Sequence, residues 1–118
     1  MVISVSPKFV HDMALRHKWL KEASQELVST LDYVQSYFGE RSVQMVYSEV
    51  SARIKQLKTF PDSGLRYKDL SFNGKEVRIS HMKRSSIIYC HDEETLLILA
   101  FWNNRSNDSI VPDLLSAR

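Results

Sequence analysis

The residues best suited to chemistry in this 118-residue sequence are its positively charged side chains. Between Leu65 and His91 six basic residues stand against two acidic ones, although the whole chain has a formal net charge of only +2. Guanidinium and ammonium groups bind phosphate and stabilise negative charge that develops in a reaction. The sequence therefore indicates a local site for an anionic ligand and not a surface of high overall charge. The basic residues of this segment are Arg66, Lys68, Lys75, Arg78, Lys83 and Arg84.

Other kinds of chemistry find no support in the sequence. It has no glycine-rich phosphate loop, no metal-ligand spacing of histidine and cysteine, and no carboxylates paired on one helix face. The single cysteine, Cys90, lies in an apolar run at 86–91, so we expect a buried strand thiol without an internal disulfide. We therefore predict no metal and no cofactor, and a reducing, cytoplasmic location.

Two amphipathic helices are predicted ahead of the basic segment. Apolar residues recur at spacings of three and four over 23–38, and Gly39 can cap the end of this helix. A second apolar helical face runs over 43–57, with Ser42 as its N-cap and Phe60-Pro61 as its end. Because the connection between them is short, the helices must fold back as an antiparallel hairpin and cover a common partner, which must be a sheet.

That sheet is predicted in the second half of the chain. The expected strands span 66–70, 76–82, 86–91 and 95–102, the first two joined by the hairpin pair Asn73-Gly74. Residues 14–20 can add one more strand. The order of elements predicts an α+β protein, with the helical hairpin on one face of a mainly antiparallel sheet of four to five strands. The other face is expected to remain available for function.

The length fits a single domain over 1–118, in which 1–13 can be an N-terminal extension and 109–118 a C-terminal tail. Two readings of 1–13 stay open: Met13 can be the true translational start, or Val2 to Val5 can form a short edge strand. No stretch has the apolar length of a signal peptide or of a membrane span, so we expect a soluble protein that is not exported.

Several short stretches occur in the order and spacing of one known family. They are Trp19-Leu20-Lys21-Glu22-Ala23, Leu31-Asp32-Tyr33-Val34, Ile54 to Leu57 with Phe60-Pro61-x-x-Gly64, Val77-Arg78, Ile87-Ile88-Tyr89, and Leu97-Ile98-Leu99 with Arg105. Through this combination, from about Trp19 to Asp108, the chain resembles the RelE/ParE toxins of type II toxin–antitoxin systems, the plasmid stabilisation family. The resemblance implies a compact fold like that of a small microbial ribonuclease. It also implies a cognate antitoxin that wraps the toxin with a helix and an extended segment.

The activity implied by the resemblance depends on the branch of the family. Some members cleave mRNA in the ribosomal A site and others poison DNA gyrase without hydrolysis, so the fold alone leaves the chemistry open. Our first hypothesis is a metal-independent endoribonuclease that acts on mRNA at the ribosome. The alternatives are a gyrase inhibitor of the ParE kind and a degenerate, non-toxic family member.

For the ribonuclease, the resemblance assigns the stabilisation of charge on the phosphate to two catalytic candidates, Arg78 and Arg105. Arg78 lies between Val77 and Ile79 on a predicted strand, so side-chain alternation directs it away from the core. Structural roles stay open beside the catalytic ones. Arg78 can pair with a carboxylate such as Asp69 across the hairpin, and Arg105 can anchor the C-terminal segment.

Lys55, Lys83 and Arg84 are the candidates for positioning RNA through its phosphates, although lysines on an exposed helix face often serve only solubility. The best-known ribosome-dependent members carry a tyrosine, or a histidine-tyrosine pair, in their C-terminal segment. This chain has neither after Arg105. The departure weakens the transfer of ribonuclease activity and keeps the gyrase hypothesis open.

The histidines and Tyr89 are not assigned to catalysis. Alternation places His81 on the opposite strand face from Arg78, and His91 is expected to be a solvated turn residue beside three acidic neighbours. Tyr89 stands among apolar strand residues, which favours a role in the core.

Overall fold

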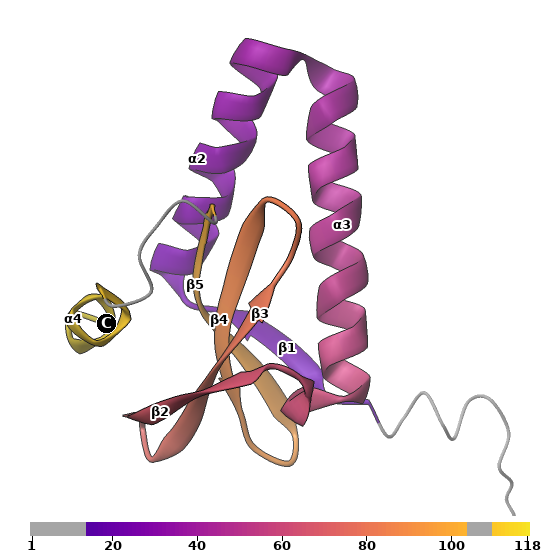
Figure 1. The fold of residues 1–118 in the computed structure, drawn as a ribbon. Coiled ribbons are helices and arrows are strands. Elements are labelled where there is room, and N and C mark those ends of the chain that lie inside the picture. The colour runs from indigo at the N-terminus through magenta and orange to yellow at the C-terminus, as the bar shows by residue number, and fades with distance from the viewer. Residues whose placement is uncertain (1–13, 104–109) are drawn as a thin grey trace, which may run out of the picture.

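The computed structural model describes residues 14–103 and 110–118, and it confirms the predicted α+β class. Two long helices rise on one side of a five-stranded sheet, and a short helix lies apart from them beside the sheet (Figure 1). In chain order the elements are β1 (Arg16–Trp19), α2 (Lys21–Phe38), α3 (Glu40–Thr59), the 3-10 turn η1 (Pro61–Ser63), β2 (Leu65–Phe72), β3 (Lys75–His81), β4 (Ser85–His91), β5 (Thr95–Asn103) and α4 (Val111–Ser116).

The sheet has the strand order β1-β5-β4-β3-β2. The last four strands form an antiparallel meander, and β1 joins its far edge parallel to β5, with Arg16 opposite Thr95. The additional strand expected at 14–20 is therefore confirmed. The hairpin prediction at Asn73-Gly74 is confirmed too, because both residues have the positive φ angles, 51° and 80°, that a tight two-residue turn requires. The alternatives for 1–13 concern residues outside the described part of the chain.

A single residue, Gly39, connects the two long helices. Its φ of 89° suits glycine, and its N–H donates to the carbonyl of Gln35 at 3.1 Å, which closes the last turn of α2. The predicted N-cap at Ser42 is wrong, because α3 already begins at Glu40 and the Ser42 hydroxyl donates to the Phe38 carbonyl. The helix then ends before Pro61, where the residue preceding a proline avoids helical geometry.

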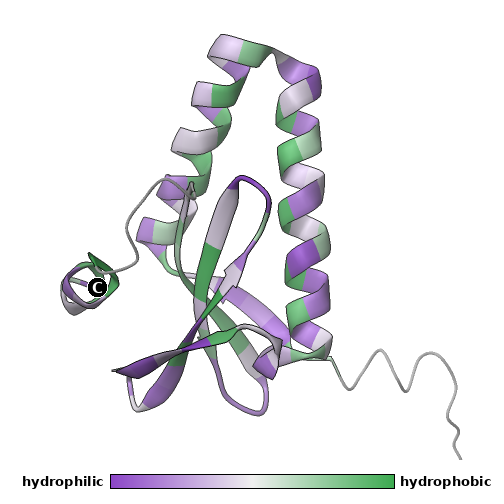
Figure 2. Ribbon diagram, in the orientation of Figure 1, coloured by the Kyte–Doolittle hydropathy of each residue, from purple (hydrophilic) through white to green (hydrophobic). Residues whose placement is uncertain are grey.

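The helical hairpin extends beyond the sheet that it covers (Figure 1). Only its lower part is buried, through Ala23 on α2 and Val50, Ile54 and Leu57 on α3. Near its tip Phe38 is 64% exposed, although its spacing placed it in the predicted apolar stripe. Helices of this length span roughly 27–30 Å at 1.5 Å per residue, and their tips project past the sheet (Figure 1). Figure 2 shows the resulting mixture of hydrophobic and hydrophilic residues along both helices.

Both faces of the sheet carry an apolar cluster. The first cluster lies under α2 and α3 and includes Leu57, Tyr89 and Ile98. The second lies on the opposite face, where Val111 and Leu115 of α4 are buried in one cluster with strand residues such as Val77, Ile79 and Trp102. The expectation of a free second face is therefore wrong. Much of the predicted C-terminal tail is a helix that contributes to this second cluster.

Candidate functional site

Arg78, the first catalytic candidate, lies near the middle of β3 opposite Tyr89 of β4. Val77 and Ile79 belong to the second cluster, whereas Tyr89 belongs to the cluster under the helices. Residues directly opposite in an antiparallel ladder share a face, so Arg78 is on the helix side of the sheet. The prediction that Arg78 points to the face away from the core is therefore wrong. The alternation was right, but apolar residues fill both faces.

The guanidinium of Arg78 is held by four protein acceptors. Its Nη1 donates to the carbonyls of Asp62 at 3.1 Å and Gly64 at 3.0 Å, and its Nη2 donates to Glu76 Oε2 at 3.3 Å. Its Nε lies 3.5 Å from Asp62 Oδ1, and only 16% of the side chain is exposed. Arg78 thus ties the turn after α3 to the sheet. Its carboxylate partners are Asp62 and Glu76, and not the predicted Asp69.

Tyr89 of β4 forms hydrogen bonds to the same turn. Its hydroxyl donates to the Pro61 carbonyl at 2.6 Å and accepts the Gly64 N–H at 3.0 Å, while the residue is completely buried. The core role predicted for Tyr89 is confirmed, with this anchoring role in addition. Burial raises the pKa of its hydroxyl, which keeps it neutral and able to donate. Gly64 approaches so closely that an added Cβ would lie 2.5 Å from the Tyr89 hydroxyl oxygen.

His91 completes the cluster from the end of β4. Its Nε2 lies 2.7 Å from Asp62 Oδ1 and its Nδ1 lies 2.9 Å from the Asp92 carbonyl. The hydrogen bond with His91 is the main reason that the pKa of Asp62 is lowered, with smaller contributions from the charges of His91 and Arg78. The His91 side chain is only 21% exposed, so the prediction of a solvated turn histidine is wrong.

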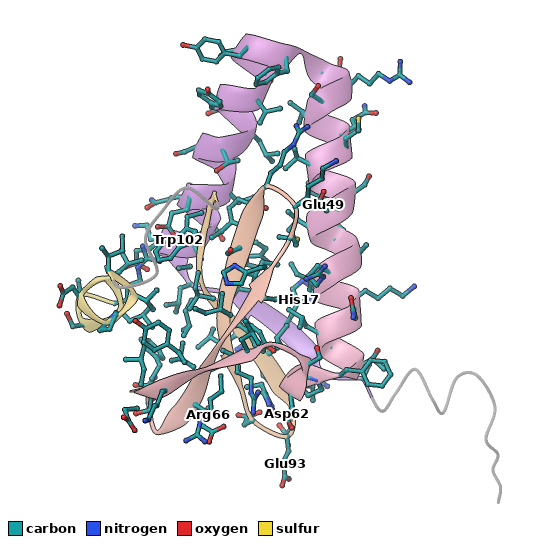
Figure 3. All side chains as sticks on the ribbon, in the orientation of Figure 1. His17, Glu49, Asp62, Arg66, Glu93 and Trp102 are labelled. Atoms are coloured by element: carbon teal, nitrogen blue, oxygen red, sulfur yellow. The ribbon has the colours of Figure 1, made fainter. Side chains whose placement is uncertain are left out.

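An open pocket of about 630 Å³ lies beside this cluster, between η1, the β2–β3 turn and the β4–β5 turn. Figure 3 shows Asp62, Arg66 and Glu93 at this end of the sheet. The titratable side chains that line the pocket are Asp62, Glu76, Asp92, Glu93, Lys75, Arg78 and His91. Four carboxylates thus stand against two permanent cations. Since like charges repel, this pocket suits a cationic group better than a phosphate.

Two of the remaining predicted site residues, Lys83 and Arg84, follow β3 and lie away from Arg78 along the chain. Lys55 is exposed on α3, and Lys83 and Arg84 form the exposed turn between β3 and β4. Lys83 is five residues beyond Arg78, which is roughly 16 Å along an extended chain. Arg105 lies outside the described residues. Around Asp62 the structure brings together Arg78 and His91; Asp62 was not among the predicted site residues, and His91 was expected to be solvated.

His81 behaves as predicted and is on the opposite strand face from Arg78, where its Nδ1 lies 2.6 Å from Ser86 Oγ. Its backbone carbonyl accepts from Arg53 Nη1 at 2.9 Å, and the same nitrogen donates to Ser80 Oγ at 2.7 Å. Arg53 was absent from the predictions because it looks like any other cation on the solvent side of a helix. Its contacts join residues 27 and 28 positions apart, and no local pattern encodes such distances.

Within residues 14–103 and 110–118, no three His, Cys, Asp or Glu side chains are grouped so that they could hold a metal ion. Cys90 is buried as predicted, and its burial raises the pKa of the thiol to about 11. No helix in the described part of the chain is long and apolar enough to cross a membrane.

Comparison with known proteins bears on the fold. No protein-family model matches the sequence, and a search of curated proteins found no match. The solved structure titled "Chromosomal ParDE TA system from P. aeruginosa" contains a chain similar to this one, with a TM-score of 0.60 and 17% sequence identity. The likeness covers 77% of this chain and 97% of that chain. The protein therefore has the RelE/ParE-like fold that its sequence resemblance implies.

Proposed function

We propose that this protein is the toxin of a type II toxin–antitoxin pair, with a cognate antitoxin as its partner. The observation that carries the proposal is the likeness to a chain whose title names a ParDE toxin–antitoxin system. That likeness includes 97% of the similar chain, so it extends over a whole domain and not over one shared motif. The resemblance of the sequence to RelE/ParE toxins supports the same function.

We further propose that the toxin acts by binding a protein target, as gyrase-directed members of the family do, and not by cleaving RNA. The support comes from Arg78. A ribonuclease needs a cation that is free to meet the phosphate, and in this structure three nitrogens of Arg78 already have protein acceptors. A phosphate would have to displace Asp62 and Glu76 from a pocket of negative net charge.

Cleavage of mRNA on the ribosome is the alternative mechanism. It would rely on Arg78 and Arg105 as catalytic groups and on Lys55, Lys83 and Arg84 as contacts to RNA. Lys55, Lys83 and Arg84 are exposed, so a phosphate can reach them. They are spread over α3 and the β3–β4 turn, however, and do not surround one reacting phosphate. Either target would place the action of the toxin in the bacterial cytoplasm.

The test is inducible expression in bacteria, with and without the neighbouring gene, while growth, protein synthesis and plasmid supercoiling are followed separately. We expect growth arrest with loss of supercoiling before protein synthesis falls, and relief of the arrest by the neighbouring gene. A supercoiling assay with purified gyrase should show inhibition without ribosomes. Immediate translation arrest with intact supercoiling would instead support mRNA cleavage. The absence of any arrest would favour a degenerate, non-toxic protein.

Variants separate the two mechanisms at the level of residues. For a binding protein, Arg78→Lys should lower toxicity only as far as it lowers the amount of folded protein. The paired substitution Lys83→Ala with Arg84→Ala tests the alternative, because it removes two exposed cations that would contact RNA in that mechanism. If Arg78→Lys abolishes toxicity while the folded protein and its antitoxin binding are unchanged, the catalytic hypothesis is favoured. Loss of toxicity in the paired variant alone would point to RNA contacts.

A further inference from the structure

The end of the helical hairpin around Gly39 has an unusual surface. Residues 28–47, here called the hairpin tip, comprise the C-terminal part of α2, Gly39 and the N-terminal part of α3. None of them is buried, and six of the nine exposed large hydrophobic residues in the described part of the chain lie among them. Hydrophobic residues that gather in this way mark an interaction site, whereas scattered ones need no explanation. The six are Val28, Tyr33, Tyr37, Phe38, Met45 and Tyr47.

The hairpin tip also has few charged residues. Its twenty residues include three, Asp32, Glu40 and Arg41, whereas the other nineteen residues of α2 and α3 include seven. No lysine occurs between Lys21 and Lys55. Since the tip projects past the sheet and meets water on more sides than the base, solvation alone would require more charge there and not less (Figure 1). Few charges combined with exposed Tyr, Phe and Met are the composition of the core of a protein–protein interface.

Tyr33 and Tyr37 form a preorganised contact surface at the tip. They are one helical turn apart on α2, with ring centroids 4.7 Å apart and ring planes inclined by 42°. The two residues are nevertheless 58% and 70% exposed. Because the rings already pack on each other, a partner that binds them immobilises little additional side-chain freedom. Tyrosine is also one of the residues that contribute most to binding energy at interfaces.

We propose that the hairpin tip binds the hairpin tip of a second copy of this chain, so that four helices meet around Tyr33 and Tyr37. A two-fold contact of this kind uses the same surface on both copies. It supplies the projecting helices with the helical neighbours that an isolated pair of helices lacks. The inference concerns this surface alone and does not depend on the toxin function proposed above.

The charge of the tip favours a second copy over other occupants. Asp32, Glu40 and Arg41 sum to a net charge of −1, so two tips repel each other only weakly and each offers both signs of charge. Helices that lie on membranes carry several Lys and Arg residues on their polar face, and this tip has one arginine and no lysine. A strongly charged partner would find almost nothing of opposite sign to pair with.

The size of the surface agrees with a weak dimer. A buried aromatic side chain contributes roughly 150–250 Å². Tyr33, Tyr37 and Phe38 are 58%, 70% and 64% exposed, and Met45 is 67% exposed. These four side chains therefore offer on the order of 500 Å² in each copy and about 1,000 Å² in a dimer, which is near the lower limit for a specific interface. We expect a dissociation constant of about 1–100 µM.

Sedimentation equilibrium of the full-length protein tests the dimer directly. Between about 1 and 500 µM, the average mass should rise reversibly from that of a monomer towards that of a dimer. Tyr37→Gln should raise the dissociation constant at least about tenfold, because it removes an aromatic ring from the contact. Tyr33→Gln serves the same purpose if Tyr37→Gln does not fold. Phe60→Gln is the matched control and should dimerise as the wild type does, since Phe60 is 62% exposed at the other end of α3.

Paramagnetic NMR shows where the two copies meet. Because Cys90 is buried, a nitroxide reagent should label only the introduced cysteine of Ser36→Cys, at an exposed position of the tip. This labelled protein is mixed with ¹⁵N-labelled wild type. We expect intermolecular broadening of the Tyr33 and Tyr37 amide signals, and none for Glu94 in the β4–β5 turn at the opposite end of the molecule (Figure 1).

Four results would overturn the proposal. The first three are a monomer over the whole concentration range, equal effects of Tyr37→Gln and Phe60→Gln, and the absence of intermolecular broadening at the tip. The fourth is a monomer whose affinity for the antitoxin falls with Tyr37→Gln, which would assign the tip to the antitoxin. The growth and supercoiling experiments do not enter this test, so the failure of one proposal is distinguishable from the failure of the other.

Discussion

Replacing Gly64 by alanine is a sensitive test of how the turn after α3 is held against the sheet. Gly64 has φ −73° and ψ 160°, which any residue adopts, so a loss of stability can only come from the added methyl group. That carbon would lie 2.5 Å from the Tyr89 hydroxyl oxygen and 2.9 Å from Cε1. Tyr89 is completely buried and cannot move aside freely. Overpacking of this kind costs about 1–3 kcal/mol.

The displacement also disturbs the two hydrogen bonds of the Tyr89 hydroxyl, to the Gly64 N–H and the Pro61 carbonyl. Each contributes about 1 kcal/mol. We therefore expect Gly64→Ala to lower the free energy of unfolding by about 2–4 kcal/mol. The assay is equilibrium urea unfolding followed by far-UV circular dichroism, with Ser63→Ala as the neighbouring control at an exposed position. The control should change stability by less than about 0.5 kcal/mol.

A double-mutant cycle tests whether the cost arises at the Tyr89 hydroxyl. Tyr89→Phe removes the atom nearest to the new methyl group, so Gly64→Ala should cost less in that background, with a coupling energy of about 1 kcal/mol. Strict additivity of the two substitutions would refute the steric explanation. A cost of Gly64→Ala below about 0.5 kcal/mol would refute the close approach itself.

Three further predictions concern other groups. The Cys90 thiol is buried and its pKa is raised to about 11, so it should resist a maleimide at neutral pH and react only in denaturant; rapid labelling of the folded protein would contradict this. Hydrogen bonds from the backbone N–H groups of Glu94 and Thr95 lower the pKa of Asp92 below its ordinary 3.8. The ionised carboxylate therefore stabilises the fold above pH 3.8, and this stabilisation is lost as the pH falls through the lower pKa of the folded state. Between about pH 5 and pH 3, the urea midpoint of Asp92→Asn should therefore fall less than that of the wild type. If the two midpoints fall in parallel with pH, Asp92 makes no such contribution to stability. Asp69 has a φ of 58°, so Asp69→Gly should raise the free energy of unfolding by up to about 1 kcal/mol and Asp69→Val should lower it, as measured by urea unfolding.

The sequence by itself was sufficient for the two long helices and for the strands, but not for α4, which lies in the predicted C-terminal tail. Spacings of three and four residues predicted both long helices, and the Asn73-Gly74 pair predicted the β2–β3 hairpin. Alternation correctly placed His81 opposite to Arg78, and the apolar run around Cys90 correctly indicated a buried strand. These features are local, because the period of a helix or a strand and the φ preference of a turn residue act over a few positions.

The surroundings of the candidate site were decided by the tertiary structure. Alternation alone cannot tell which face of the sheet the helices cover, and it cannot show that α4 contributes to the other face. Arg78 was therefore predicted to lie on a free face of the sheet, whereas both faces carry an apolar cluster.

Apart from Glu76 on the same strand, the partners of Arg78 come from a turn 14 and 16 residues earlier in the chain, and His91 reaches Asp62 across 29 residues. The Pro61-x-x-Gly64 pattern marked that turn in advance. Which strand residues the turn would meet depended on how the chain folds back over the sheet, and that is a property of the assembled structure and not of any short segment.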